Sequence, residues 1–66
     1  MQNRIKALRA EKNMTQEELA KLSNISRTTL VSIERGQSTP DGKTIAKIVK
    51  ALGVPANRIF FDLDVV

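Results

Sequence analysis

The chain has 66 residues, enough for one domain over residues 1–66 with a thin margin of stability. It contains no Cys and no His, which excludes disulfide staples, His- or Cys-based catalysis and the usual zinc sites. Eleven Lys and Arg against seven Asp and Glu give a net charge of +4. That charge suits a polyanionic partner, although many small domains are mildly basic too.

Long apolar runs and catalytic motifs are both missing from the sequence. No segment approaches the roughly 20 apolar residues of a membrane span, and no apolar run follows the first residues as in a signal peptide. There is no Gly-rich phosphate loop, and no carboxylates cluster at a spacing useful for catalysis. We therefore expect a soluble, cytoplasmic protein that is not an enzyme, with no cofactor, metal, membrane contact or evident small-molecule ligand.

Two helices are predicted in the first third of the chain. Asn3 can cap a helix over residues 3–12, and Asn13 suits the left-handed conformation that ends helices. Thr15 and Glu18 form a capping box, Thr-x-x-Glu, at the start of the second helix. The residues expected to face inward on these helices are Ile5, Leu8, Leu19, Ala20 and Leu22.

Two more helices follow after short turns. Ser26 is the expected N-cap of a helix over residues 27–35, which Gly36 ends in a left-handed conformation. Thr39 is the expected N-cap of the fourth helix, with Pro40 at its first position. The inward faces carry Leu30 and Ile33 on the third helix, and Ile45, Ile48, Val49 and Leu52 on the fourth, which Gly53 stops.

The last dozen residues combine a short helix with a strand-like tail. Pro55 opens a fifth helix that ends near residues 59–60. The tail, residues 61–66, alternates apolar and acidic side chains, which is the period of a strand. An isolated strand is not stable, so the tail needs a partner in the first residues or in a second subunit. We predict that residues 1–3 pair antiparallel with residues 63–65.

Residues 16–35 fit the helix-turn-helix arrangement, in which a short turn joins two helices and the second helix is polar outward. Ala20 is small where the two helices would cross, and Ile25 would fill the turn. The segment closely resembles the Cro/repressor-type (xenobiotic-response-element-like) helix-turn-helix family of transcriptional regulators, and the resemblance covers residues 3–60. It implies an all-α, five-helix, repressor-like domain that binds double-stranded DNA sequence-specifically as a transcriptional regulator, in particular a repressor.

The outward side of the third helix holds the candidate base contacts. Recognition helices touch base edges mainly through their N-terminal residues. Arg27 is the leading candidate, because a guanidinium group can grip O6 and N7 of guanine in the major groove. Hydroxyl groups can donate or accept there, and an aliphatic side chain can touch a thymine methyl group. The candidate base contacts are Arg27, Thr28, Val31 and Ser32.

Phosphate contacts need amide, hydroxyl or cationic donors at the rims of the groove. The resemblance assigns this role to Gln16, at the start of the second helix, where the helix dipole also favours an anion. Arg35 could reach a phosphate or remain solvated, and Thr29 could contact a phosphate or pack locally. The full set of candidate phosphate contacts is Gln16, Thr29, Arg35, Gln37, Ser38, Thr39 and Lys43.

Other positions have structural interpretations through the resemblance. Arg9 and Glu34 match positions that hold an ion pair in that family, and we interpret them as structural rather than as DNA contacts. Asn13 and Asn24 stand where the family commonly has Gly, so both should adopt positive φ. Gly42 falls where relatives often carry an apolar residue, which puts the first turn of the fourth helix in question.

One such domain reads too few base pairs for specificity in a genome, whereas a twofold dimer reads half-sites about 34 Å apart. We therefore expect a homodimer on a palindromic operator. No part of the chain is left for a separate dimerisation domain, so the interface is expected at Ile59, Phe60, Phe61, Leu63 and Val65. Of the two aromatic residues, Phe60 and Phe61, one should lie in the core and the other in the dimer contact. The alternative is that both complete the core of a monomer.

Two other functions compete with this interpretation. One is an antitoxin-type autoregulator that also binds a partner protein, a role that usually needs additional chain. The other is a helix-turn-helix used only for protein interaction, which Arg27 and the hydroxyl groups of the third helix disfavour. The expected source is a bacterium or phage, and the expected location is the cytoplasm, on the nucleoid when DNA is bound.

Overall fold

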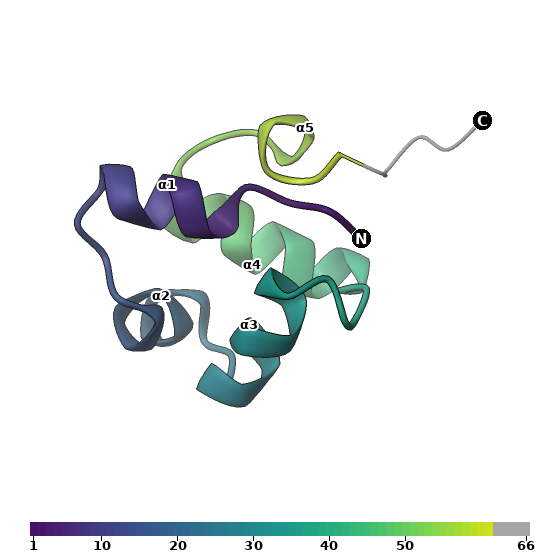
Figure 1. The fold of residues 1–66 in the computed structure, drawn as a ribbon, viewed down its shortest axis with the longest axis horizontal. Helices are drawn as coiled ribbons and strands as arrows, with labels where there is room; N and C mark the ends of the chain where they lie inside the picture. Colours follow the sequence, from purple (N-terminus) through teal and green to yellow (C-terminus); the bar gives the residue numbers. More distant parts are fainter. Residues whose placement is uncertain (62–66) are drawn as a thin grey trace.

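A computed structural model describes residues 1–61 of the chain, and within that range the regular elements are helices (Figure 1). They are α1 (Ile5–Glu11), α2 (Gln16–Ser23), α3 (Arg27–Glu34), α4 (Gly42–Leu52) and α5 (Ala56–Ile59). The all-α, five-helix class predicted from the sequence is therefore confirmed.

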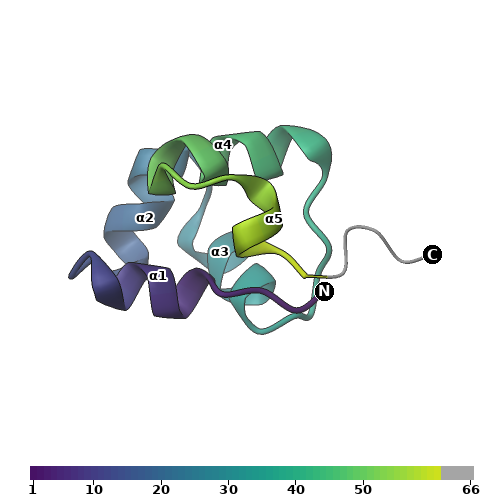
Figure 2. The same ribbon diagram turned by 90° about the horizontal axis from the view of Figure 1, so that it is seen from above.

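The longest helix, α4, runs through the middle of the molecule. Both α2 and α5 pack against α4, and α3 packs against α2. Figure 2, seen from above, shows α4 on one side and α1 on the other, with the end of α5 beside the N-terminal segment. Helices α1, α4 and α5 thus form the part of the fold that supports the α2–α3 pair, and we call these three helices the brace.

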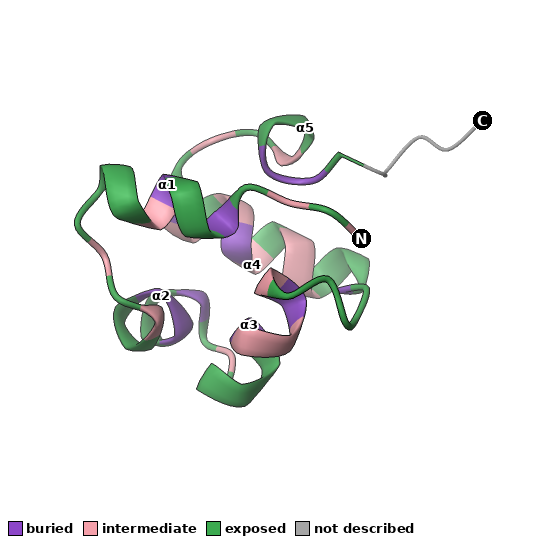
Figure 3. Ribbon diagram, in the orientation of Figure 1, coloured by how far each residue is buried: buried purple, intermediate pink, exposed green. Residues whose placement is uncertain are grey.

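Each of the five helices contributes apolar side chains to one core. Burying such side chains is the main favourable term in folding a small domain. Figure 3 shows the buried positions on the helix sides that face one another and exposed positions on the outer sides. The buried apolar residues are Ile5, Leu8, Leu19, Ala20, Leu30, Ile33, Ile48, Leu52, Ile59 and Phe60.

Side-chain caps start α2 and α3 as the sequence predicts. The Thr15 hydroxyl accepts a hydrogen bond from the Glu18 amide at 3.0 Å, and Glu18 Oε1 accepts one from the Thr15 amide at 2.8 Å. The Ser26 hydroxyl accepts from the Thr29 amide at 3.0 Å. These bonds satisfy amide groups that have no partner inside the helix.

Left-handed residues end the helices where they were predicted. Asn13 and Asn24 have φ angles of 53° and 55°, so both asparagines take the place that a glycine would fill. Gly36 and Gly53 have φ angles of 74° and 71°, after α3 and α4 respectively. The predicted turns are thus confirmed at all four positions.

The start of α4 differs from the prediction. Asp41, rather than Thr39, is the N-cap: its Oδ1 accepts a hydrogen bond from the Thr44 amide at 2.8 Å. The helix therefore begins at Gly42, and Pro40 is a buried loop residue instead of the first helical one. Both Thr39 and Asp41 are good capping residues, and the packing of Pro40 places Asp41 at the helix start.

Leu22 was expected to face the core, and this prediction is wrong. Its side chain is 61% exposed, whereas the neighbouring Ser23 is 1% exposed. The buried side of α2 is defined by Leu19, Ala20 and Ser23, at spacings of one and four residues. At 100° per residue, Leu22 lies about 100° from the centre of that side, and therefore at the helix flank.

Asn3 ties the start of the chain to α3. Its Nδ2 donates to the Ile33 carbonyl at 2.8 Å, and its Oδ1 accepts from the Ile5 amide at 3.1 Å. The structural N-cap of α1 is Arg4, which makes no side-chain cap bond. Asn3 thus supplies the capping acceptor from one position earlier than the cap, and α1 is shorter than the predicted 3–12.

The two ends of the described chain pair antiparallel, in a register different from the predicted one. Asn3 stands opposite Phe60 in an isolated bridge, whereas the prediction placed it opposite residue 63. The flanking hydrogen bonds run from the Arg4 amide to the Ile59 carbonyl at 2.8 Å and from the Phe61 amide to the Gln2 carbonyl at 3.1 Å. The first residues of the chain thus pair with the residues at the end of α5 and immediately after it. The predicted partners 63–65 lie outside the described residues.

Candidate nucleic-acid interface

The α2–α3 pair has the geometry of two helices joined by a tight turn (Figure 1). Residues 24–26 link them, and the Ile25 amide donates to the Ala20 carbonyl at 3.0 Å. Ala20 is 4% exposed, and Ile25 packs against the core beside it. A larger side chain at position 20 would force the helices apart, so the pair depends on this small residue.

Helix α3 buries one side and leaves the other open. Leu30 and Ile33, at 0% and 2% exposure, hold it to the core. On its open side lies a surface hollow of about 430 Å³. All four candidate base contacts line this hollow, and Arg35 and Gln37 line it with them. The six lining residues are Arg27, Thr28, Val31, Ser32, Arg35 and Gln37.

A second hollow of about 600 Å³ lies at the N-terminal end of α2. Gln16 and Arg27 both line it, so Arg27 borders the two hollows and connects them into one surface. Lys6, from α1, also lines it and was missed at the level of sequence. An exposed lysine on a first helix has no signal of its own, because only the packing of α1 brings it beside α2.

Glu34 joins three helices through one carboxylate. Its Oε2 accepts from Arg9 Nε at 2.7 Å, and its Oε1 accepts from Arg9 Nη2 at 3.0 Å. Gln16 Nε2 donates to the same Oε1 at 3.2 Å, and Arg9 Nη1 donates to the Met14 carbonyl at 3.0 Å. The two charged side chains are 12% and 6% exposed. A bidentate ion pair of this kind fixes the relative orientation of its two side chains. It therefore holds α1, the start of α2 and the end of α3 in fixed relative positions.

The loop after α3 is attached to the helix that precedes it. Ser38 Oγ donates to Ser32 Oγ at 2.9 Å, and the Gln37 amide donates to the Ser32 carbonyl at 3.0 Å. Thr39 and Lys43 are exposed but line neither hollow. The structure thus brings Gln37 and Ser38 against α3, whereas Thr39 and Lys43 are exposed outside both hollows.

Thr29 has a local bond that competes with an external role. Its Oγ1 accepts a hydrogen bond from Ser26 Oγ at 2.8 Å, next to the N-cap bond of α3. Thr29 is exposed, but it does not line either hollow. Of the two roles predicted for it, local packing is the one with a visible contact.

The hollow on α3 has two cationic lining residues, Arg27 and Arg35, and no acidic one. Two acids on the neighbouring elements are used as helix caps. The Thr15 amide beside Glu18 lowers the pKa of that carboxyl, and the Thr44 amide does the same to the pKa of Asp41. Both carboxylates are therefore held charged by backbone donors, and neither of them lines the hollow on α3.

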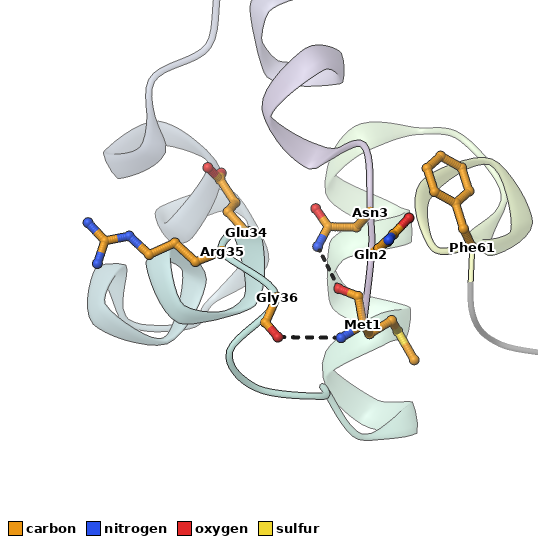
Figure 4. A pocket seen from close by; sticks show the side chains of 7 residues that line it. All are labelled: Met1, Gln2, Asn3, Glu34, Arg35, Gly36 and Phe61. Carbon is orange, nitrogen blue, oxygen red and sulfur yellow. Dashed lines mark hydrogen bonds between the residues drawn. The ribbon is translucent and has the colours of Figure 1, made fainter.

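The prediction placed a dimer interface at the end of α5 and in the residues that follow it. The structure removes two residues from that interface. Ile59 and Phe60 are 0% and 2% exposed, so their side chains complete the core of their own chain and cannot form an outer contact. Phe61 is 46% exposed and, with Met1 and Gly36, lines a hollow of about 460 Å³ (Figure 4). Among the described residues, Phe61 alone remains of the expected interface.

Residues 1–61 show no group of three or more Asp, Glu, His or Cys side chains that could hold a metal ion. In the same range, every helix is too short or too polar to cross a lipid bilayer.

Residues 5–59 match the family described as Helix-turn-helix. An uncharacterised HTH-type transcriptional regulator of Methanocaldococcus jannaschii is 45% identical over 64 residues, which are 97% of each chain. The immunity repressor protein of Bacillus phage phi105 is 41% identical over 56 residues, which are 85% of this chain and 39% of the repressor. An archaeal relative means that the likeness is not confined to the bacterial and phage sources expected from the sequence.

Among solved structures, the restriction-modification controller protein C.AhdI from Aeromonas hydrophila superimposes with a TM-score of 0.81 at 35% identity, covering 86% of each chain. The matched range, residues 5–59, contains all the helices described above. Sequence, fold and the open polar side of α3 agree, and the chain belongs to the helix-turn-helix family of transcriptional regulators.

Proposed function

We propose that residues 1–66 act as one unit that binds a palindromic double-stranded DNA operator as a homodimer and represses transcription in the cytoplasm, on the nucleoid. The observation that carries the proposal is the hollow on α3, where four candidate base contacts and Arg35 border a surface without acidic residues. With its side chains an α-helix such as α3 is about 10–12 Å across, which suits a major groove about 12 Å wide.

Within this complex, Arg27 reads guanine, and Thr28, Val31 and Ser32 touch the adjacent base edges. Arg27 is exposed and lies in the first turn of α3, the part of a recognition helix that reaches furthest into the groove. The link between Ser32 and Ser38 at 2.9 Å fixes one hydroxyl of this set. Fixing donors before binding reduces the entropy lost on association.

Phosphate groups are bound on both sides of α3. On one side, Gln16 and Lys6 line the hollow at the start of α2, and the bond from Gln16 to Glu34 at 3.2 Å orients the amide. On the other side, the proposed contacts follow α3 in the chain; they are Arg35, Gln37, Ser38, Thr39 and Lys43. Thr29 is a weaker candidate because its hydroxyl already bonds Ser26.

The homodimer contact is proposed around Phe61, which is the exposed aromatic residue next to the paired chain ends. Leu63 and Val65, the apolar residues that follow Phe61 at alternate positions in the sequence, are proposed to take part in the same contact. A shared twofold axis would place two α3 helices in successive major grooves, about 34 Å apart. The relatives named as repressors support the direction of regulation.

Selection of bound fragments from a random DNA pool tests this proposal directly. The expected result is an inverted repeat whose half-sites are centred about 10 base pairs apart, with a guanine at a fixed place in each half. Enrichment of no sequence, or of a single unrepeated site, would contradict the proposed dimer and its operator.

A further inference from the structure

The first residues of the chain lie between two surfaces that the proposed function uses. One is the end of α3, and the other is the proposed dimer contact at Phe61. In Figure 4, Met1, Gln2 and Asn3 stand between the end of α3 and Phe61. Residues from all three segments line one hollow of about 460 Å³. The first residues are therefore placed to join the dimer contact to α3.

The backbone of this segment is fixed to the residues around Phe61. Asn3 stands opposite Phe60 in the antiparallel bridge. On one side of the bridge, the Phe61 amide donates to the Gln2 carbonyl at 3.1 Å. On the other side, the Arg4 amide donates to the last carbonyl of α5 at 2.8 Å. The position of Asn3 relative to Phe61 is thus set by backbone hydrogen bonds.

The side chain of Asn3 is fixed to α3. Its Nδ2 donates to the Ile33 carbonyl at 2.8 Å and to the Met1 carbonyl at 3.4 Å, and its Oδ1 accepts from the Ile5 amide at 3.1 Å. Ile33 lies in the last turn of α3, where carbonyls lack the usual partner within the helix. Both ends of the Asn3 amide are therefore used, and a carboxylate of the same shape could not donate to Ile33.

Packing between the helices offers a longer route between the same two surfaces. Helix α5 packs against α4, α4 against α2, and α2 against α3. Through Asn3, by contrast, one residue connects the bridge beside Phe61 to the backbone of α3. A rotation of α3 relative to the dimer contact therefore has to bend or break the hydrogen bond from Asn3 to Ile33.

In a twofold dimer this orientation counts twice, because the same arrangement is repeated in both copies. The two α3 helices have to meet successive major grooves about 34 Å apart. One base pair more or less between the half-sites moves a half-site by about 3.4 Å along the DNA and turns it by about 35° around the axis. A dimer that holds α3 firmly cannot follow that change, whereas a dimer in which α3 can turn follows part of it.

We propose that Asn3 is a positioning residue, which fixes the orientation of α3 relative to the dimer contact and so determines the half-site spacing that the dimer accepts. The inference rests on the proposed homodimer and deepens it, because no contact with a base or a phosphate is assigned to Asn3. The side chain acts through Ile33, whose neighbour Ser32 lines the hollow on the open side of α3.

Affinities for operators of three spacings test the inference. One operator has the selected spacing, and the others are one base pair shorter and one longer. The unsubstituted chain should bind the altered spacings about tenfold or more weakly, because only half of the dimer can then engage. Asn3→Asp keeps the acceptor for the Ile5 amide but has no donor for the Ile33 carbonyl, so it should reduce this ratio to about threefold or less. A general loss of folded protein would change every affinity but not the ratio.

Two further variants separate positioning from charge. Asn57→Asp makes the same change of charge at an exposed position of α5 and should keep the full ratio. Asn3→Ser adds no charge, retains the turn bond to the Ile5 amide and is too short to bond Ile33, so it should behave as Asn3→Asp does. Its affinity for an isolated half-site, which one α3 binds alone, should stay within about twofold of the unsubstituted chain.

Sedimentation of the proteins without DNA measures the dimer separately, and the Asn3 variants should dimerise as the unsubstituted chain does. Full spacing ratios in both Asn3 variants would overturn this inference alone. Equal weakening on every operator and on the half-site would also overturn it, as would a weaker dimer, which would place Asn3 in the dimer contact itself. An unsubstituted chain that is monomeric or has no preferred spacing would overturn the proposed homodimer and this inference together.

Discussion

At the scale of single residues, Arg27 carries the most specific prediction. It lines both hollows of the interface, and it stands in the first turn of α3. Arg27→Ala should weaken operator binding by about 1–3 kcal/mol and relax the preference at one position of each half-site, because a two-pronged contact to guanine is lost. Fluorescence anisotropy with the operator and with a single-base variant measures both effects. An equal loss on unrelated DNA would instead make Arg27 a phosphate contact.

Lys6 tests the role of the hollow at the start of α2. Because a phosphate contact carries no sequence information, Lys6→Gln should weaken binding to all sequences alike and reduce the salt slope by about 1. The matched control is Lys12→Gln, an exposed lysine that does not line the hollow. Slopes of log K against log salt for the three proteins give the answer, and identical slopes for Lys6→Gln and the unsubstituted chain would refute the contact.

Glu34 makes a prediction about stability rather than binding. Glu34→Ala leaves Arg9, whose side chain is 12% exposed, without its partner, and it also frees Gln16. Breaking a largely buried pair costs about 3–5 kcal/mol, a large part of the total stability of a small domain. Chemical denaturation measures this, with Glu11→Ala on the exposed side of α1 as control. Equal unfolding free energies for the two variants would contradict the structural role.

Residue chemistry alone locates part of this site. Arg27 and its neighbours on α3 follow from helical spacing and from the hydrogen bonds that arginine and hydroxyl groups can make. Lys6 could not be found this way, because only the tertiary fold brings it into the hollow at the start of α2. The burial of Phe60 and the exposure of Phe61 likewise depend on which face of the paired chain turns inward.

At the scale of elements, the start of a helix can be predicted where the sequence offers one capping residue. The prediction fails where two capping residues compete. The capping box at Thr15 and the cap at Ser26 start α2 and α3 as predicted. At α4, Thr39 and Asp41 are both good caps two residues apart, and only the burial of Pro40 decides between them. Leu22 shows the same limit, since helical period alone does not give the width of the buried side.

The Asp41 cap gives a pH-dependent prediction for α4. Its pKa is lowered in the folded state by the Thr44 amide, so its contribution to stability is present above about pH 4 and is lost as pH falls through the lowered value. Asp41→Asn keeps an acceptor for that amide but does not titrate, so its melting temperature should fall less between about pH 5 and pH 3. Melting curves by circular dichroism give the comparison.

Thr39→Ala is the control for that experiment, because Thr39 does not cap the helix. Its melting temperature should follow the unsubstituted chain at every pH. A profile for Asp41→Asn that overlays the unsubstituted one would remove Asp41 from the pH dependence, and Glu18, whose pKa the Thr15 amide lowers, would then be the next carboxyl to replace.

At the scale of the whole molecule, the brace of α1, α4 and α5 leaves α3 with one buried and one open side. The all-α class could be predicted because apolar periods and caps are local. The register of the paired ends could not, since it depends on backbone geometry after α5 that side-chain alternation does not encode. The proposed dimer likewise depends on two surfaces meeting, which the pattern of one chain does not encode.

The central claim is that α3 reads the major groove, and base analogues in the selected operator test it most directly. Affinity is measured with 7-deazaguanine, which lacks the N7 acceptor of the major groove, and separately with inosine, which lacks the amino group in the minor groove. We predict that 7-deazaguanine at the half-site guanine weakens binding about tenfold or more, that inosine leaves binding nearly unchanged, and that Arg27→Ala abolishes the difference. Loss of affinity with inosine but not with 7-deazaguanine would contradict recognition through α3.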